Sequence, residues 1–178
     1  MGSRVVDPER DRVPMIEGLP VLDHVESAGA PTMGTSGKPV GAAAVVSTGG
    51  SMGLLRLPFD ARSRSRLRAR LEDGTEVALV LPRGTVLRDG AVVSGAGLRV
   101  RVLAAEEDVL EVRARMPIAL ARAAYHLGNR HVPVQVGADR LLLGYDAVLA
   151  DMLVGLGATL IRTWSPFEPE GGAYGHGH

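Results

Sequence analysis

Residues 116–128 read MPIALARAAYHLG, and this stretch decides how the second half of the chain folds. Pro117 is favoured in the first turn of a helix, because the N–H that proline lacks has no intrahelical partner there. Apolar side chains then recur at helical spacing as far as Gly128. The stretch therefore predicts a helix over 117–128 that ends at the glycine.

The segments around this helix complete a two-layer pattern. A second helix is predicted to begin after Asp146, whose side chain can cap free N–H groups, and to end at Gly157. Short strands are predicted at Val109–Arg113, Val132–Val136, Arg140–Leu143 and Thr159–Trp164. This order is the signature of a ferredoxin-like βαββαβ domain, which we expect over 115–165. Such a fold serves many functions, so function has to be argued from particular residues.

The preceding residues 52–114 are predicted to form a small, β-rich N-terminal domain, which makes the fold class α+β. Arginine occupies every second position from Arg62 to Arg70. Side chains alternate between the two faces of a strand, so this pattern predicts a strand with one solvated face.

Three hairpins are predicted within or next to this β-rich domain. Their turns are Asp73-Gly74, Asp89-Gly90 and the acidic run Glu106–Asp108. The strands that they would join are the arginine strand with Glu76–Leu81, Val86 with Val93, and Leu98–Ala104 with Val109–Arg113.

Residues 1–51 are predicted to be a poorly structured extension. Pro, Gly, Ser and Ala dominate residues 28–51, which predicts a loop, and Met15–Val25 is a candidate for one strand. Gly34–Lys38 looks like part of a phosphate-binding loop, but Pro39 stands where a hydroxyl would have to hold Mg²⁺. No nucleotide site is predicted there.

The composition excludes several classes of protein. Cysteine is absent, so any metal would have to be held by imidazole and oxygen ligands. Lys+Arg and Asp+Glu both number 20 and aromatic residues make up 3%, so neither nucleic acid nor a membrane is expected as a partner. The chain has no apolar run of membrane-spanning length and no signal-peptide pattern, which predicts a cytoplasmic protein.

The five histidines include the candidate metal ligands. His131 follows the predicted helix end in a connecting turn, where an imidazole can reach outward. His176 and His178 are separated by glycine in a predicted flexible tail, 166–178, that could close around a metal held elsewhere. His126 would lie on a different side of the helix from His131, so it is assigned to packing or to support of the site.

No catalytic set stands in the sequence. No serine lies in a nucleophile elbow, no HExxH motif occurs, and the acidic residues 106–108 are assigned to a turn. A protein that is not an enzyme is therefore expected. The arginine strand leaves a nucleic-acid-binding protein as the weakest alternative, against which stand the neutral net charge and Glu72-Asp73 directly after the strand.

Several motifs together resemble one known family. YHLGNRH at 125–131 is followed by Asp151-Met152-Leu153 and by PFEPE at 166–170. Their order and spacing are similar to those of the urease accessory nickel metallochaperones, the UreE family. LVLPRG at 79–84 resembles the N-terminal domain of that family, and the similarity covers about residues 52–178.

The resemblance implies a cytoplasmic homodimer with a peptide-binding-like N-terminal domain and a metal-binding, dimerising C-terminal domain. It implies that His131 binds Ni²⁺ near the twofold axis of the dimer. His176 and His178 correspond in kind to the further ligands that relatives supply from a tail. Zn²⁺ or Cu²⁺ could bind the same imidazoles. The implied partners are the urease-associated GTPase and the urease apoprotein complex.

Two departures from the family pattern limit this expectation. Residues 143–147 (LGYDA) lack the histidines that many relatives carry before the second helix, and the tail has two histidines instead of a long tract. High-capacity nickel storage is therefore not expected, and no role is assigned to His24. A non-catalytic interaction module of the urease maturation complex, with degenerate metal binding, is the alternative.

Overall fold

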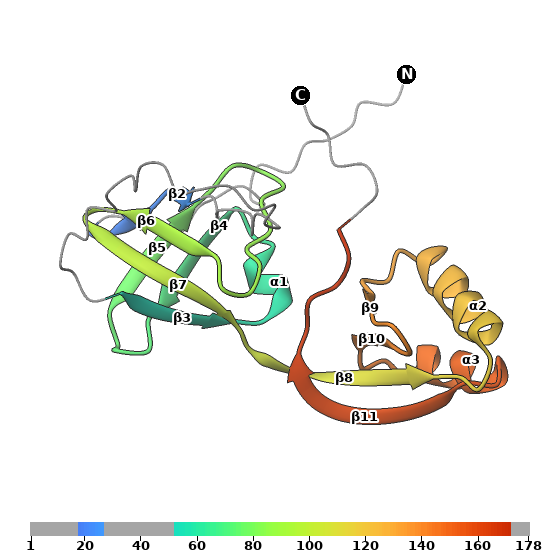
Figure 1. The fold of residues 1–178 in the computed structure, drawn as a ribbon. Coiled ribbons are helices and arrows are strands. Elements are labelled where there is room, and N and C mark those ends of the chain that lie inside the picture. The colour runs from blue at the N-terminus through green and yellow to red at the C-terminus, as the bar shows by residue number, and fades with distance from the viewer. Residues whose placement is uncertain (1–17, 27–51, 172–178) are drawn as a thin grey trace, which may run out of the picture. The chain divides into compact units, whose positions relative to one another are not determined.

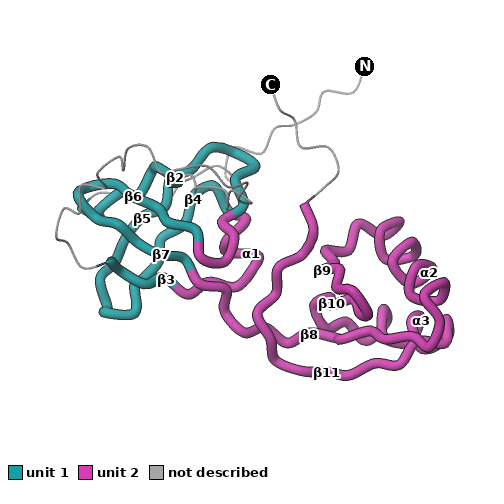
Figure 2. The backbone as a smooth tube through the Cα atoms, in the orientation of Figure 1, with its two compact units in different colours: residues 1–55, 64–86, 91–102 teal, residues 56–63, 87–90, 103–178 magenta. Residues whose placement is uncertain are grey.

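The computed structural model of the chain describes residues 18–26 and 52–171 (Figure 1). The chain separates into two compact units (Figure 2): residues 1–55, 64–86 and 91–102 form unit 1, and residues 56–63, 87–90 and 103–178 form unit 2. Unit 2 thus takes in three segments of the region 52–114 expected to be the β-rich domain: residues 56–63, 87–90 and 103–114. The predicted boundary at 114/115 stays a prediction.

Unit 1 is built on two β-sheets. The first has the strand order β1 (Val21–Leu22), β5 (Glu76–Val80), β4 (Arg66–Arg70), and the second has the order β2 (His24–Glu26), β6 (Val92–Gly95), β7 (Leu98–Ala104), β3 (Gly53–Leu57). The last residues of β3 and β7 belong to unit 2. Residues alternate between buried and less buried along β3 and much of β7, with Leu55, Leu57, Val100 and Val102 inward, whereas the central strand β5 buries Val77, Ala78 and Leu79 in a row. This alternation is what the period of a strand requires when one face packs against a core.

The arginine run does not form one continuous strand. Its start lies in the short helix α1 (Phe59–Arg62), and β4 covers only Arg66–Arg70. Arg66, Arg68 and Arg70 are exposed, as predicted, but Arg62 is fully buried. The prediction of a solvated strand was therefore wrong at Arg62, because contacts to residues distant in the sequence hold it and a local pattern does not report them.

One of the three predicted hairpins is confirmed. β4 pairs antiparallel with β5 across the Asp73-Gly74 turn. Asp89-Gly90 does not close a hairpin, because β6 pairs with β2 and β7 instead. The acidic residues 106–108 are not a turn but the start of β8 (Glu106–Arg113), which pairs with β10 and β11 rather than with β7.

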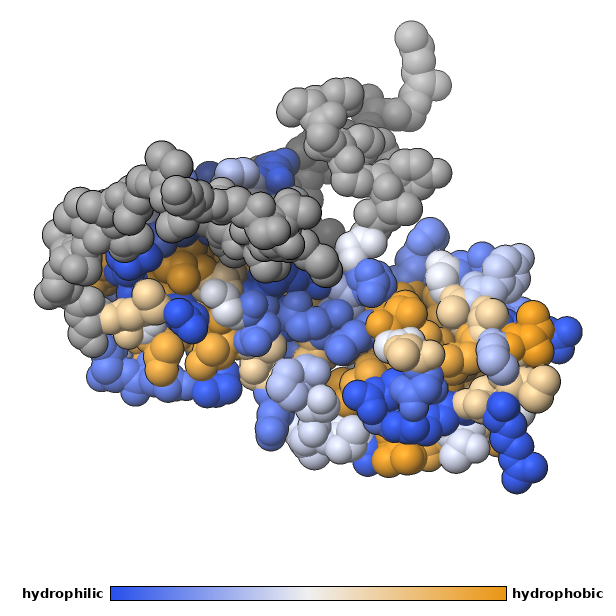
Figure 3. Space-filling model, in the orientation of Figure 1, coloured by the Kyte–Doolittle hydropathy of each residue, from blue (hydrophilic) through white to orange (hydrophobic). Residues whose placement is uncertain are grey.

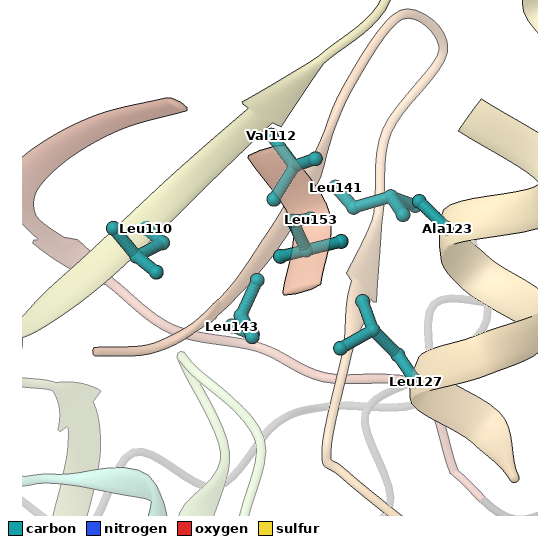
Figure 4. Packing of buried hydrophobic residues seen from close by; sticks show 7 residues of the cluster. All are labelled: Leu110, Val112, Ala123, Leu127, Leu141, Leu143 and Leu153. Atoms are coloured by element: carbon teal, nitrogen blue, oxygen red, sulfur yellow. The ribbon is translucent and has the colours of Figure 1, made fainter. Parts of the chain in front are cut away.

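Unit 2 contains the predicted βαββαβ order, so the α+β fold class is confirmed. Its elements are β8, α2 (Pro117–Gly128), β9 (Gln135–Val136), β10 (Leu141–Gly144), α3 (Ala147–Gly155) and β11 (Thr159–Pro166). The sheet is antiparallel, with the order β11-β8-β10-β9. Both helices bury side chains against one face of it (Figure 4), in a core of Leu110, Val112, Ala123, Leu127, Leu141, Leu143 and Leu153.

An ion pair joins β11 to β8 at the surface of this sheet. Arg162 donates from Nε and Nη2 to the two carboxylate oxygens of Asp108, at 2.8 and 2.6 Å. Its guanidinium lies 3.6 Å from the centre of the Tyr145 ring. The hydrogen bonds from Arg162 hold the pKa of Asp108 below its ordinary value, because they stabilise the charged carboxylate. The acidic start of β8 is thus tolerated within a strand because β11 supplies a cation.

No helix among residues 18–26 and 52–171 is long and apolar enough to cross a membrane.

Candidate metal centre

Helix α2 ends in a chain reversal at His131. The His131 N–H donates to Gly128 O at 2.9 Å, and the Val132 N–H donates to Leu127 O at 3.2 Å. These two bonds define the Schellman motif, which needs a left-handed residue just after the helix. His131 is that residue, with φ of 55°.

The left-handed conformation of His131 carries a cost. The Cβ atom of an L-residue crowds its own backbone there, which costs about 1–2 kcal/mol, and glycine is the usual occupant. Within the described ranges, the only other non-glycine residue with positive φ is Ala96. The sequence correctly predicts that the helix ends at Gly128, but the reversal itself comes three residues later. A histidine at a position that suits glycine makes its side chain a candidate for a functional role.

Helix α3 ends in the same motif with the usual residue. The Gly157 N–H donates to Val154 O at 2.9 Å, and the Ala158 N–H donates to Leu153 O at 3.0 Å. Gly157 has φ of 83°, and a Cβ atom built on it would meet no atom within 4 Å. The two helix ends therefore differ in the residue at the reversal but not in their hydrogen bonds.

The side chain of His131 is exposed, and that of His126 is partly buried. The His126 ring packs edge-on against Tyr125, with ring centres 5.4 Å apart. Arg130 donates from Nη1 to His126 O at 3.0 Å. The Arg130 bond involves only the main chain of His126, so the role expected of its side chain, packing or support of the site, stays a prediction.

The remaining histidines are not brought to His131 by the described part of the chain. His24 lies exposed in β2 of unit 1. His176 and His178, the predicted tail ligands, lie outside the described residues. Over residues 18–26 and 52–171, no group of three or more His, Asp or Glu is arranged to hold a metal. A metal bound by His131 would thus need ligands from a second copy or from the rest of the chain.

Helix α2 exposes a second apolar stripe besides the one that it buries. Ile118 and Tyr125 are seven residues apart, which places them on the same side of the helix, and they are 59% and 66% exposed. Figure 3 shows hydrophobic residues at the surface of the part of the chain that holds α2 and α3. A helix on the surface of a monomer ordinarily presents polar residues outward, so this stripe is suited to contact with another protein surface.

The local pattern of the sequence did not reveal Arg62 as an anchoring residue. Arg62 donates from Nε to Leu57 O at 3.1 Å, from Nη1 to Leu87 O at 3.0 Å and from Nη2 to Phe167 O at 2.5 Å. Nη1 also donates to the carboxylate of Glu168. The buried guanidinium is therefore surrounded by acceptors, as a charge removed from water has to be.

Glu168 and its neighbours are fixed by the same cluster. The Asp89 N–H and Arg88 donate to the Glu168 carboxylate, and the Glu168 N–H donates to Gln135 Oε1 at 2.8 Å. Residues 166–171 are predicted to begin a flexible tail, but this cluster holds them in place. They directly precede the segment that contains the two tail histidines. The sequence does not indicate this role of Glu168, because the partners of its side chain, Arg62 and Arg88, are remote in the sequence.

Comparisons with known proteins agree with this architecture. Residues 48–105 match the family model described as UreE urease accessory protein, N-terminal domain, and residues 107–178 match that of the C-terminal domain.

Individual relatives are similar over most of the chain. A urease accessory protein UreE from Burkholderia thailandensis is 65% identical over 125 residues, which cover 70% of this chain and 59% of the relative. One from Burkholderia pseudomallei is 64% identical over 125 residues, which cover 70% of this chain and 62% of the relative. The chain therefore spans about three fifths of the length of these curated relatives.

Proposed function

The chain belongs to the UreE family of urease accessory proteins, and on that premise we propose that it binds Ni²⁺ as cargo and delivers it for assembly of the urease active site. It acts in the cytoplasm as a carrier, without catalysing a reaction. Its partners are the urease-associated GTPase and the urease apoprotein complex.

The backbone of His131 is the observation that carries this proposal. The residue is left-handed at φ of 55°, and its side chain is exposed. Glycine would make the same turn with less strain, and packing does not require an exposed imidazole. Imidazole is a common ligand of divalent transition metals. The strain is therefore explained if His131 is needed as a nickel ligand.

A C2 homodimer would supply the second ligand that one copy lacks. In such a dimer each copy contributes the same patch, so a single histidine near the axis is doubled. The exposed stripe of Ile118 and Tyr125 lies on the helix that leads to His131. Burial of this stripe against a second copy would place the two His131 residues on facing surfaces.

His176 and His178 complete the coordination sphere in this proposal. The ion pair of Arg62 and Glu168 fixes the point from which the chain continues toward these two histidines. Ligands on a short arm can dissociate one at a time and open a position through which an acceptor attacks the metal. Imidazole sites bind Cu²⁺ more tightly than Ni²⁺, so selection for nickel comes from metal supply and from the receiving partner.

Nickel titration of the whole chain by calorimetry tests the proposal, with the mass in solution followed at each step. The decisive variant is His131→Asn, because asparagine tolerates the left-handed conformation but lacks the imidazole. We expect it to lose about one Ni²⁺ per dimer relative to the unchanged chain.

The matched control is His126→Asn, which removes a packing histidine from the same helix and should keep the stoichiometry. The proposed site is wrong if His131→Asn binds nickel with unchanged affinity and stoichiometry, or if His126→Asn causes the same loss.

An interaction module with degenerate metal binding is the second candidate. Two observations favour it: the described residues of one copy contain no metal-binding cluster, and residues 143–147 lack histidine. Deletion of residues 176–178 separates the two functions. A carrier should lose nickel affinity or a site, whereas a module should bind its partner as before and show no change in its response to nickel.

A further inference from the structure

Strand β4 forms an edge of its sheet in unit 1. It pairs with β5 on one side, and no described strand pairs with it on the other. Arg66, Arg68 and Arg70 on β4 are exposed, whereas the alternating Leu67 and Ala69 are partly buried. The three arginines therefore stand on one face of an edge strand, about 6.6–6.8 Å apart along it.

Hydrogen bonds at both ends of β4 show which way its backbone groups point. The Leu81 N–H donates to Ser65 O at 2.7 Å, and the Leu71 N–H donates to Thr75 O at 2.8 Å. In an antiparallel pair, residues bonded to the neighbouring strand alternate with residues that are not. The odd-numbered residues of β4 therefore direct their N–H and C=O groups to β5.

The even-numbered residues, which are the arginines, direct their backbone groups to the open edge. Just past the strand, the Glu72 N–H does find an acceptor on that side, Leu54 O at 2.9 Å. The part of β4 whose outer edge is unpaired is thus limited to Arg66–Arg70. Over this length the same residues offer cationic side chains and main-chain groups that have no strand partner among residues 18–26 and 52–171.

The charges on this edge are only partly compensated. Arg70 pairs with Glu76 directly opposite on β5, at 2.9 Å. Arg66 and Arg68 face Val80 and Ala78 on β5 and have no acidic partner among the described residues. The Arg70 pair shows that a carboxylate on an adjacent strand can reach these arginines.

We propose that β4 binds an extended, acidic segment of a partner protein, which adds to the sheet as a further strand. Main-chain hydrogen bonds to the even-numbered residues would hold the segment, as in other cases of strand addition. Carboxylates at every second position would match the spacing of Arg66 and Arg68, as cross-strand pairs do within a sheet. This function is separate from metal binding, because it uses unit 1 and no histidine.

A nucleic acid fits this edge less well than an acidic strand. Because Arg70 pairs with Glu76, the uncompensated positive charge on β4 is limited to Arg66 and Arg68, and so short a run suits two carboxylates better than a continuous phosphate backbone. Stacking platforms are lacking as well, because aromatic residues make up 3% of the chain. A phosphate backbone also offers no amide pattern to match the open main-chain groups.

Fluorescence anisotropy with the full chain tests the proposal. The probe is a labelled peptide of about eight residues with alternating Glu and Val, a length typical of a strand. We expect Arg66→Gln/Arg68→Gln to weaken its binding about tenfold, since two exposed ion pairs are lost. Arg101→Gln is the matched control, because Arg101 is exposed on β7, which is paired on both sides, and it should bind the peptide normally.

Chemical changes to the peptide test whether it binds as an added strand. They leave the protein unaltered, so the result holds even if a protein variant folds poorly. Two peptides are compared, one with every odd amide methylated and one with every even amide methylated. Methylation removes main-chain donors but keeps the charge, so we expect one of the two methylated peptides not to bind. Equal binding of both methylated peptides, unchanged binding by the double variant, or an equal loss in Arg101→Gln would overturn the proposal. Displacement of the peptide by a single-stranded oligonucleotide of equal charge, at a lower concentration than unlabelled peptide, would do so too.

Discussion

The ends of α2 and α3 are the same motif made with different residues. Both close with one hydrogen bond to the third residue back and one to the fifth residue back. In both, the next residue packs against the core of unit 2: Val132 after α2 and Ala158 after α3. Only the reversing residue differs, His131 in one helix and Gly157 in the other.

The comparison separates what the fold needs from what the function needs. The fold needs a left-handed residue at each helix end, and glycine supplies it without strain. The histidine at the end of α2 adds nothing to this geometry. Its presence marks the one of two equivalent ends where we propose that a metal is bound.

The largest expected effect comes from exchanging the two residues. The double variant His131→Gly/Gly157→His keeps the composition and leaves one strained residue. We expect its nickel affinity to fall at least about a hundredfold, because loss of a ligand should exceed the 10–100-fold cost of losing a supporting residue. Calorimetric titration measures this, and nickel binding that survives the exchange would show that the position of the histidine is unimportant.

The second effect is the strain that a histidine brings to the other helix end. Gly157→His should lower the free energy of unfolding by about 1–2 kcal/mol, because the left-handed backbone disfavours any side chain there while a Cβ atom finds open space. Gly155→His is the matched control, since Gly155 lies in the last turn of α3 with helical φ and open space around it. Urea denaturation compares the two, and an equal loss in both would argue against backbone strain as the cause.

The smallest effect is the relief of strain in α2. His131→Gly should raise the free energy of unfolding by up to about 1 kcal/mol, an amount reduced by the greater freedom of glycine in the unfolded chain. Urea denaturation without metal measures it. A loss of more than about 1 kcal/mol would mean that the imidazole makes packing contacts, and backbone strain at His131 would then be no sign of a metal-binding role.

The sequence predicted those features of the fold that local chemistry decides. Pro117 begins α2, and Asp146 caps α3 by accepting the Leu149 N–H at 2.9 Å. α3 ends at Gly155, two residues before the predicted stop, and Gly157 makes the left-handed reversal that closes it. These signals are read within a few residues of where they act, so a single sequence is enough to find them.

Features decided by remote partners could not be predicted in this way. Arg62 looks like its neighbours in an alternating run, yet Leu87 O, Phe167 O and Glu168 hold it in the interior. The acidic start of β8 resembles a turn in the sequence, because the sequence does not show that Arg162 lies beside Asp108. The position of His131 in an exposed turn follows from the sequence, but its left-handed backbone does not.

The buried cluster at Arg62 also has a consequence for the order in which the chain folds. Phe167 and Glu168 follow Arg62 by 105 and 106 residues. A ribosome releases the arginine long before these acceptors exist, and until then its charge stays in water. The segment around α1 therefore reaches its final packing only once synthesis has passed residue 168. The first segment of unit 2 therefore cannot pack until its last segment has been made. This dependence on long-range contacts makes the folding of unit 2 slower than that of a chain with local contacts alone.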